Sequence, residues 1–454
     1  MITPPAPIVP PLLPGGTGPL GHAPLLLADP VRLLAAALAV PGPAVAVRLP
    51  GPAYLLRDPR DLRHILADPV AFPRAGMVPQ NRPVFGAGVM LREGAGHRAA
   101  RALLLPAFHG EALAAMTRTI ATRAEALAAD WAARAARGDG RVALSRAMAE
   151  LALTIAAEIF LGLDLAGDAP RLGRAVRQLQ LLMFKRATAA ELAPSGAATP
   201  EDAAYRAAIA TMHETIAGAI ARRRAAWPAG RSGGGADALD LLLAARDERG
   251  ATLRPDRLRD ELATLILAGH ETTATALTWS LLLLADNAPA RERLVAEARS
   301  APAVDGPGLL RALPWAEACF LETLRLYPPV YVIQRRPRRD AVLPSGVAVG
   351  RGVGLLLAPY LAGRDPATFA DATGFLPGRW LPDATPVPAS TASFAPFGSG
   401  PHRCLGEGLA RLEGALILAA LARAVRIVPD EPARAVALVT LLPAGPVRAT
   451  LHPA

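Results

Sequence analysis

The sequence predicts a mainly α-helical protein with small β-sheets, and three observations carry this prediction. Apolar residues recur with helical spacing through most of the region from residue 97 to residue 327. Segments with strand alternation and turn residues lie at 44–56, 330–360 and 424–452. No linker clearly divides the 454 residues into two cores. We therefore expect one domain over residues 23–454, preceded by a proline-rich arm over residues 1–22.

Each expected element has a local reason. Seven prolines among the first 19 residues exclude a helix from the arm. Asp29 is suited to cap a helix that starts at Pro30, and Pro41-Gly42 ends it. Residues 73–96 are rich in proline and glycine, which predicts a long loop of the kind that often carries function. The expected helices cover residues 30–40, 59–66, 97–105, 111–135, 144–162, 168–187, 200–226, 236–248, 255–286, 314–327 and 405–423.

Composition excludes several classes of protein. Hydrophobic residues make up 52% of the chain, which excludes a disordered protein, and two cysteines are too few for a disulfide scaffold. The net charge of +10 comes from 48 arginines and one lysine, which are spread along the chain without a basic block. This distribution favours a solvated surface over nucleic-acid binding.

Targeting signals are also missing from the sequence. The first arginine is Arg32, so the N-terminus lacks the basic region of a secretory signal. The longest uncharged helical run, 272–285, is shorter than the roughly 20 residues that a membrane span needs. We expect a soluble, cytoplasmic monomer.

The most informative segment is the loop from Phe397 to Gly406, which brings Cys404 to the start of a helix. Gly398 and Gly400 permit a tight bend, and Gly406 lets another group approach closely. Backbone N–H groups and the positive helix end favour a thiolate there. A lone thiolate without a second ligand at metal spacing does not suit zinc, but it suits the single axial ligand of a haem iron.

At this point the segment resembles the haem-binding signature of the cytochromes P-450, Phe-Gly-x-Gly-x-His/Arg-x-Cys-x-Gly, at every position. The resemblance extends from about residue 40 to the end of the chain. It implies the single triangular fold of that family, with haem b held between the long central helix and the helix after Cys404. A buried structural cysteine and a disulfide with Cys319 are the alternatives. A reducing cytoplasm argues against the disulfide.

The helix expected over 255–286 carries unusual residues at its middle. Ala268, Gly269, Glu271 and Thr272 interrupt an apolar stretch, where Gly costs about 1 kcal/mol relative to Ala and a buried acid needs a partner. The segment resembles the family's oxygen-activation motif. The resemblance implies that Gly269 admits dioxygen, that Thr272 hydrogen-bonds it, and that Glu271 relays protons.

A second motif, Glu322-x-x-Arg325, places an acid and a base on one face of the helix over 314–327. Taken alone, such a pair is usually a surface contact. The family has a similar pair, joined by a later arginine that corresponds to Arg379. By resemblance the three residues hold the cysteine loop against the core, and losing one partner would cost roughly 3–5 kcal/mol.

Haem carries two propionates, so cations should surround it. By resemblance, these are His97 and Arg101, one helical turn apart, together with Arg335 and His402. Arg336 is the alternative to Arg335. Gly363 departs from the family, because many members carry His at that position.

Family topology also suggests which residues form the substrate pocket. They include the loop over 77–90, which contains Phe85 and Met90, and the segment Val330–Ile333, which contains Val332 and Ile333. The others are Leu181, Leu182, Phe184, Leu265, Ala268, Leu441 and Leu442. This lining suits a terpenoid, a fatty acid or a macrolide-like compound.

Only 50 residues follow Cys404, so no fused reductase domain is expected. The resemblance then implies electrons from NAD(P)H through a separate ferredoxin or flavodoxin-type donor, docked near Arg403 and Arg411. The expected activity is insertion of one oxygen atom of dioxygen into an apolar small molecule, in a setting of secondary metabolism. A peroxide-driven peroxygenase and a non-catalytic haem-thiolate sensor are the alternatives.

Overall fold

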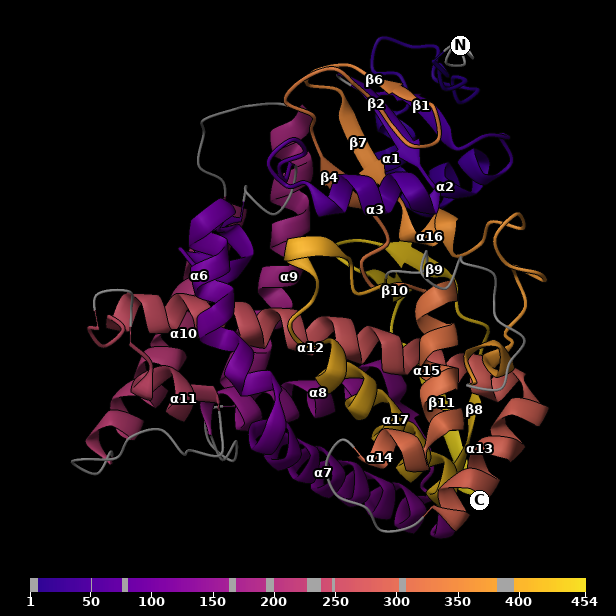
Figure 1. The fold of residues 1–454 in the computed structure, drawn as a ribbon. Coiled ribbons are helices and arrows are strands. Elements are labelled where there is room, and N and C mark those ends of the chain that lie inside the picture. The colour runs from indigo at the N-terminus through magenta and orange to yellow at the C-terminus, as the bar shows by residue number, and fades with distance from the viewer. Residues whose placement is uncertain are drawn as a thin grey trace.

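The computed structural model describes residues 7–49, 51–75, 81–162, 169–192, 200–226, 238–246, 250–301, 308–381 and 396–454. Helices dominate these residues, and small sheets lie at the edges of the helical body (Figure 1). The mainly α-helical class is therefore confirmed. Residues 77–80 of the predicted substrate loop lie outside the described residues.

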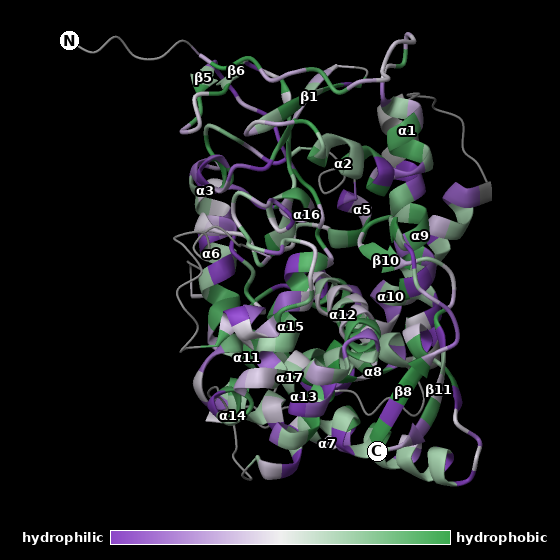
Figure 2. Cartoon of the chain, turned by 90° about the vertical axis from the view of Figure 1, so that its right-hand side faces the viewer, coloured by the Kyte–Doolittle hydropathy of each residue, from purple (hydrophilic) through white to green (hydrophobic). Residues whose placement is uncertain are grey.

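The longest helix is α12 (Pro255–Asp286), with the predicted bounds. Figure 2 shows it almost end-on near the middle of the molecule. It packs against α8 (Leu144–Leu161), α10 (Pro200–Ala225), α15 (Pro314–Leu326) and α17 (Glu407–Ala424). Most of its residues are buried, which explains why the sequence around its central motif is apolar.

The other helices surround this centre. They are α1 (Ala23–Ala28), α2 (Pro30–Leu38), α3 (Pro59–Ala67), α5 (Arg82–Phe85), α6 (Gly94–Leu104), α7 (Gly110–Ala136), α9 (Ala169–Leu192), α11 (Ala238–Ala244), α13 (Ala288–Ser300), α14 (Gly308–Ala312) and α16 (Pro359–Ala362). The 3₁₀ turns in the described part of the chain are η1 (Val89–Leu91), η2 (Leu105–Phe108), η3 (Pro377–Trp380) and η5 (Gly400–His402). As predicted, the Asp29 carboxylate caps α2 by accepting from the backbone N–H of Arg32 at 3.0 Å.

Several helices lie where none was predicted. Between residues 286 and 314, α13 occupies Ala288–Ser300, where the Asn287 side chain caps it by accepting from the Ala290 N–H at 3.0 Å. The predicted loop over 73–96 contains α5 and η1, and α6 starts at Gly94, ahead of the predicted 97. Short helices of this kind form because the surrounding structure holds them, and local periodicity does not reveal them.

The largest sheet joins two regions that are far apart in the sequence. Its strand order is β1 (Ala44–Arg48), β2 (Pro52–Leu56), β7 (Gly354–Leu357) and β4 (Ile333–Arg335). The segment predicted as strands over 44–56 forms the antiparallel hairpin β1–β2, and β2 pairs with β7 in parallel. The sheet therefore places β4, which ends at Arg335, beside the N-terminal part of the chain.

Three smaller sheets complete the fold. They contain β3 (Arg141–Ala143), β11 (Arg448–Pro453) and β8 (Val425–Pro429) in that order, then β9 (Ala435–Ala437) with β10 (Leu441–Pro443), and β5 (Ala341–Val342) with β6 (Ala348–Val349). The sequence analysis did not predict β3, because three residues carry too little alternation to be recognised. It exists through antiparallel pairing with β11.

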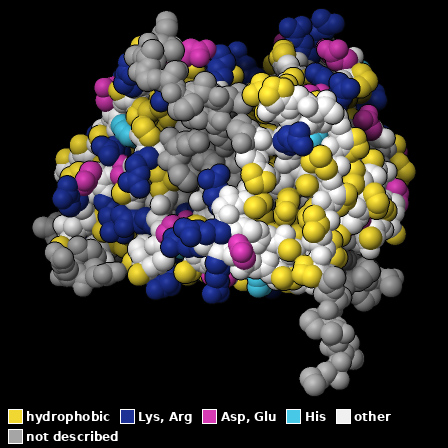
Figure 3. All heavy atoms as spheres, turned by 90° about the horizontal axis from the view of Figure 1, so that it is seen from above, with side chains coloured by type: hydrophobic (Ala, Val, Ile, Leu, Met, Phe, Trp, Pro, Cys, Tyr) yellow, Lys and Arg dark blue, Asp and Glu magenta, His cyan; other side chains and the backbone are white. Residues whose placement is uncertain are grey.

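Residues 7–13 of the proline-rich arm are extended and attached to the sheets. The Ile8 N–H donates to Gly346 O at 2.7 Å, and the Leu13 N–H donates to Ala46 O at 2.8 Å. Leu13 is buried, whereas Val9 is 78% exposed. On the face seen in Figure 3, basic side chains stand in several separate groups among acidic and hydrophobic ones, which agrees with the absence of a basic block in the sequence. Among the described residues, no helix is long and apolar enough to cross a membrane.

Candidate active site

The cysteine loop has the tight bend that its glycines predict. Gly398 and Gly400 have φ values of +71° and +67°, in the left-handed region that favours glycine. A Cβ added to Gly400 would stand 2.4 Å from Leu66 O, so the loop lies directly on α3. The Cys404 N–H donates to Phe397 O at 2.9 Å, which closes the loop just before α17.

The Cys404 thiol is largely surrounded by protein, although the residue keeps accessible surface. Burial raises the pKa of the thiol, and the Gly406 N–H, Arg101 and Arg403 act in the opposite direction. The helix start and the two arginines thus favour the thiolate, as expected, but they do not outweigh burial. A bound metal would favour the thiolate further, because metal binding displaces the thiol proton.

Two phenylalanines connect the cysteine loop to the central helix. A Cβ at Gly406 would lie 4.0 Å from Cys404 Sγ and 3.8 Å from Phe108. The rings of Phe108 and Phe160 have centroids 6.1 Å apart. A Cβ at Gly269 would lie 3.2 Å from the Phe160 ring. Gly406 and Gly269 thus stand at the two ends of one aromatic contact chain, which brings the two predicted motifs together.

Three residues near the middle of α12 keep accessible surface. Between residues 260 and 282, only Ala268, Gly269 and Thr272 are partly exposed, and the other residues are buried. Their spacing of i, i+1 and i+4 puts them on the same side of the helix. We call these three residues the open stripe of α12.

The polar groups of the motif are the Thr272 hydroxyl and the Glu271 carboxyl. Thr272 Oγ1 donates to Ala268 O at 2.6 Å and keeps its oxygen lone pairs free to accept. Burial raises the pKa of Glu271 to about 7. Thr440 lies near enough to lower that pKa slightly, although its hydroxyl makes no hydrogen bond with good geometry. A carboxyl with a pKa near neutrality can both take up and release a proton.

Cationic and imidazole side chains meet beside the cysteine loop. The rings of His97 and His402 are 4.3 Å apart and perpendicular. Burial lowers the pKa of His97 to about 4 and that of His402 to about 3, so both are neutral at pH 7. The positive charge beside them therefore comes from Arg335 and Arg74, whose backbones pair in an isolated β-bridge.

This cluster fits the propionates of a haem. Arg335 is buried, and its Nε has no hydrogen-bond partner among the described residues. The Nδ1 atom of His402 is also buried without a partner. Buried donors of this kind need an acceptor, and a carboxylate supplies one. Arg336, the alternative to Arg335, is exposed.

Two further arginines lie close to this cluster, the predicted Arg101 and the unpredicted Arg74. Arg101 is half-buried and donates to the backbone oxygen of Arg403, which ties α6 to the cysteine loop. Sequence reasoning missed Arg74, which donates to the backbone oxygens of Met90 and Arg92. No local pattern distinguishes Arg74 from the other arginines of the chain. Only its pairing opposite Arg335 reveals it.

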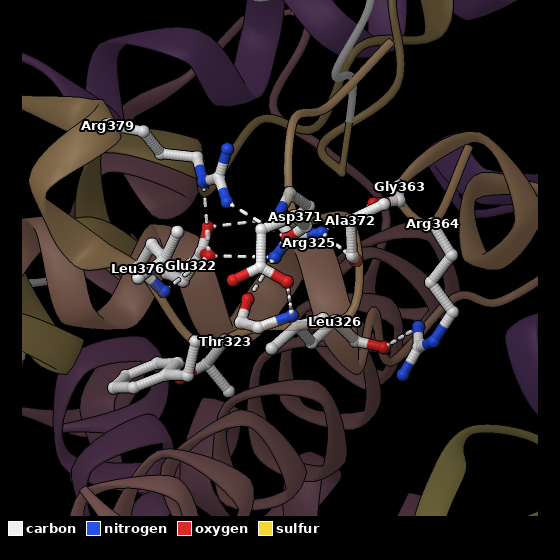
Figure 4. A network of polar contacts seen from close by, with 12 residues as sticks. Glu322, Thr323, Arg325, Leu326, Gly363, Arg364, Asp371, Ala372, Leu376 and Arg379 are labelled. Carbon is white, nitrogen blue, oxygen red and sulfur yellow. Dashed lines mark hydrogen bonds and ion pairs between the residues drawn. The ribbon is translucent and has the colours of Figure 1, made fainter. Parts of the chain in front are cut away.

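The predicted ion-pair framework is present and buried (Figure 4). Arg325 donates to both carboxylate oxygens of Glu322, at 2.7 and 2.9 Å, and neither side chain has accessible surface. Arg379 Nε donates to the same carboxylate at 3.2 Å. The indole N–H of Trp380 and the backbone N–H of Leu376 add two further donors at 2.8 Å each.

The structure explains why glycine occupies position 363 in this chain. Its carbonyl accepts from Arg325 at 2.6 Å, and an added Cβ would stand 2.3 Å from Arg325 O. The backbone of residue 363 thus lies directly on the ion-pair framework. A side chain at this position requires a different path for the loop.

The predicted pocket residues differ in exposure. Phe85, Leu182 and Leu265 are buried, and Met90, Phe184, Val332, Ile333 and Leu442 are partly buried. Leu181 and Val330 are exposed at 48% and 42%. Leu441 has no accessible surface and cannot line an open pocket, because it packs inward where Trp279 Nε1 donates to its carbonyl oxygen at 2.8 Å.

The remaining cysteine is an ordinary core residue. Cys319 lies on α15 with no accessible surface, and both cysteines are free, which confirms that they form no disulfide. Among the described residues, no three His, Cys, Asp or Glu side chains gather to hold a metal ion. The thiol of Cys404 therefore suits a metal that brings its other ligands with it, as haem does.

Comparisons with known proteins agree with this geometry. The family model "Cytochrome P450" matches residues 41–434. Cyclooctatin synthase from Streptomyces melanosporofaciens is 30% identical over 92% of this chain and 89% of its own length. Cyclooctat-9-en-7-ol 5-monooxygenase from the same organism is also 30% identical, over 92% and 89%. Pentalenene oxygenase from Streptomyces avermitilis is 34% identical over 54% of each chain.

Two solved structures share the fold. The cytochrome P450DA heme domain superposes with a TM-score of 0.85 over 99% of both chains, at 23% identity. Retinoic acid bound cyanobacterial CYP120A1 gives a TM-score of 0.84, over 99% of this chain and 100% of its own, at 22% identity. The matching family model and the monooxygenases among the relatives thus define a haem-dependent monooxygenase. The chain belongs to the cytochrome P450 family and is a monooxygenase that uses haem, dioxygen and electrons from a redox partner.

Proposed function

We propose that this monooxygenase oxidises a terpenoid hydrocarbon or an alcohol derived from one, with Cys404 as the axial thiolate ligand of haem b. One observation supports this assignment of the site. The open stripe of Ala268, Gly269 and Thr272 is linked to the cysteine loop through the contacts of Phe160 and Phe108. When bound, the haem supplies the redox chemistry that activates dioxygen.

The side chains of this protein have separate tasks in that reaction. Arg335, Arg74 and His402 would hold the propionates, and His97 would support His402 through its ring contact. Gly269 leaves room beside the helix, and the Thr272 hydroxyl orients the oxygen molecule. Glu271 passes protons inward. One oxygen atom enters a C–H or C=C bond of the substrate, while two electrons and two protons convert the other into water.

The terpenoid class is inferred from relatives and from the nature of the lining. Two relatives that match nearly full length are named for cyclooctatin and cyclooctat-9-en-7-ol, and a third for pentalenene. The described pocket candidates that keep some accessible surface include Met90, Val332, Ile333 and Leu442, all apolar. Such a lining binds a hydrocarbon through buried area and offers few hydrogen bonds to a polar substrate.

The electron donor would be a ferredoxin or flavodoxin-type protein reduced by NAD(P)H through its reductase, and the enzyme would act as a cytoplasmic monomer. Arg403 is 57% exposed and pairs with Glu407 at 2.6 Å, and Arg411 pairs with Glu317. An acidic donor can exchange these surface partners for its own carboxylates. Changing Arg403 to Glu should therefore raise the KM for an acidic donor, with an effect that shrinks at high salt.

The carbon monoxide spectrum of the reduced protein tests the haem ligand. The wild-type protein and Cys319→Ser should show the red-shifted band that is typical of a thiolate ligand, and Cys404→Ser should lose it. A band retained in Cys404→Ser would overturn the assignment. The substrate class is tested by the spin-state shift of the ferric haem with pentalenene, cyclooctat-9-en-7-ol, dodecanoic acid and a macrolide. A shift caused only by the last two would contradict the terpenoid proposal.

A further inference from the structure

The start of the substrate loop is attached to the rest of the protein by polar contacts that the proposed function does not explain. Residues 81–91 comprise Asn81, α5 and η1, and their first half contacts α10. The Tyr205 hydroxyl donates to Asn81 Oδ1 at 3.0 Å, and His213 Nε2 lies 3.2 Å from Val84 O. These contacts hold the loop at the side of α10.

The second half of the loop is bound by two adjacent acids of α12. The Ala87 N–H donates to Asp260 Oδ2 at 2.8 Å, and the Val89 N–H donates to Glu261 Oε2 at 2.7 Å. Asp260 is 6% exposed and Glu261 is fully buried. Burying two neighbouring carboxylates is costly unless hydrogen bonds and cations satisfy them.

The loop glycines make this approach possible. A Cβ at Gly86 would stand 2.1 Å from Asp260 Oδ2, and one at Gly88 would stand 2.4 Å from Thr264 Oγ1. Gly86 also has a φ of +55°, which favours glycine. The backbone therefore lies directly on the helix, with no side chain between them.

The attachment lies on the same side of α12 as the open stripe. Glu261 precedes Ala268 by seven residues and Thr272 by eleven, which are spacings that keep residues on one helix face. The far end of the loop reaches the propionate cluster, because Arg74 donates to Met90 O and Arg92 O. Residues 86–91 thus extend from the oxygen-activation helix to the cations beside the cysteine loop.

Charged groups lie around the two acids on both sides. Arg259 pairs with Asp260 at 2.7 Å, and Arg257 approaches Glu261 at 3.9 Å. From the loop side, Arg92 donates to Ala87 O at 2.6 Å. Glu261 Oε1 has no hydrogen-bond partner among the described residues, so Glu261 is attached to the loop by its bond to Val89.

We propose that Asp260 and Glu261 are positioning residues, which fix the backbone of residues 86–91 over the open stripe of α12 and thereby determine the orientation in which a substrate is oxidised. This inference rests on the proposed function, since it concerns the same site. The carboxylates do not touch the substrate. They act through the loop, whose partly buried Met90 and buried Phe85 then have one position.

Amide hydrogen exchange measures the attachment directly. In Glu261→Leu, which has no acceptor, exchange at Val89 should rise by about tenfold or more, because the hydrogen bond that protects this amide is lost. In Glu261→Gln, which keeps an acceptor oxygen, the rise should be smaller. Asp256→Asn is the matched control, because Asp256 is an exposed acid of the same helix that pairs with Arg254 at 3.0 Å. Its effect at Val89 should be nil.

Product analysis tests the consequence for catalysis. With the compound from the set above that gives the largest spin-state shift, Glu261→Leu should change the ratio of oxidation products and lower the yield per electron, and Glu261→Gln should largely restore both. Unchanged exchange at Val89, or faster exchange with an unchanged product ratio, would overturn the proposal. Failure of the proposed function is distinguishable, because it would appear in the wild-type spectrum and spin shift, whereas the exchange measurement needs neither.

Discussion

Glu322 and Arg325 form a doubly hydrogen-bonded ion pair in which neither side chain has any accessible surface. The pair is completed by backbone groups from a loop that lies far away in the sequence. Arg325 donates to Gly363 O, Ala372 O and Gly374 O at 2.6 to 2.7 Å. The ion pair therefore organises residues 363–376, and this explains why it lies in the interior.

Glu322→Gln tests this framework. The change leaves Arg325 as a buried charge without its counter-ion, which should lower the free energy of unfolding by roughly 3–5 kcal/mol. Chemical denaturation measures the loss. Glu150→Gln is the control, because Glu150 forms an exposed pair with Arg146 on one helix face and should change stability by less than about 0.5 kcal/mol. Equal effects of the two substitutions would contradict the assignment.

Arg335→Leu tests the propionate cluster. The variant removes a buried guanidinium whose Nε has no protein partner among the described residues. The substitution should therefore weaken the binding of haem. We expect haem to transfer from Arg335→Leu to apomyoglobin about tenfold faster than it transfers from the wild-type protein. Arg336→Leu changes the neighbouring exposed arginine and should leave the transfer rate unchanged. A faster rate in both variants would point to a general effect of charge.

Thr272→Ala tests the open stripe. Without the hydroxyl, more of the electrons consumed should appear as hydrogen peroxide and fewer as oxidised product, while haem content stays the same. Thr273→Ala is a matched control, because Thr273 is adjacent but buried on another side of α12. Product and peroxide are measured per NAD(P)H consumed. Coupled product formation that is unchanged in Thr272→Ala would show that this hydroxyl has no such role.

Glu413→Gln tests a buried acid in α17. Burial raises the pKa of Glu413 to about 8 from its ordinary 4.5, and its Oε1 has no partner among the described residues. Between these two values the folded chain holds a proton that the unfolded chain has lost, so stability falls as pH rises through this window. The fall is on the order of 1 kcal/mol per pH unit for one such group.

The variant should lose that part of the pH dependence, because glutamine does not titrate. Denaturation curves at pH 5, 6.5 and 8 give the slope for each protein. The wild type should lose more stability than Glu413→Gln over this range. Parallel slopes would mean that Glu413 is ionised in the folded protein or reached by solvent.

Local chemistry explains which parts of the site were predictable. Cys404 and its glycines lie within ten residues, and the bend they form depends on φ angles that glycine alone adopts easily. The polar residues in the middle of an apolar helix also stand out in the sequence. Arg74 and Asp260 were not recognisable in this way, because each acts through a residue more than 170 positions away.

By itself, the sequence of this protein determined the helical class, the bounds of α12, the thiol-bearing loop and the family. These depend on periodicity, capping and a contiguous motif, which are all local. Only the tertiary structure decided which cations meet, that Leu441 packs inward, and that residues 86–91 lie on Asp260 and Glu261. The physical reason is that burial and pairing depend on packing between residues far apart in the sequence. Such packing changes the pKa of a side chain and the availability of its hydrogen-bond donors, but it leaves no pattern along the chain.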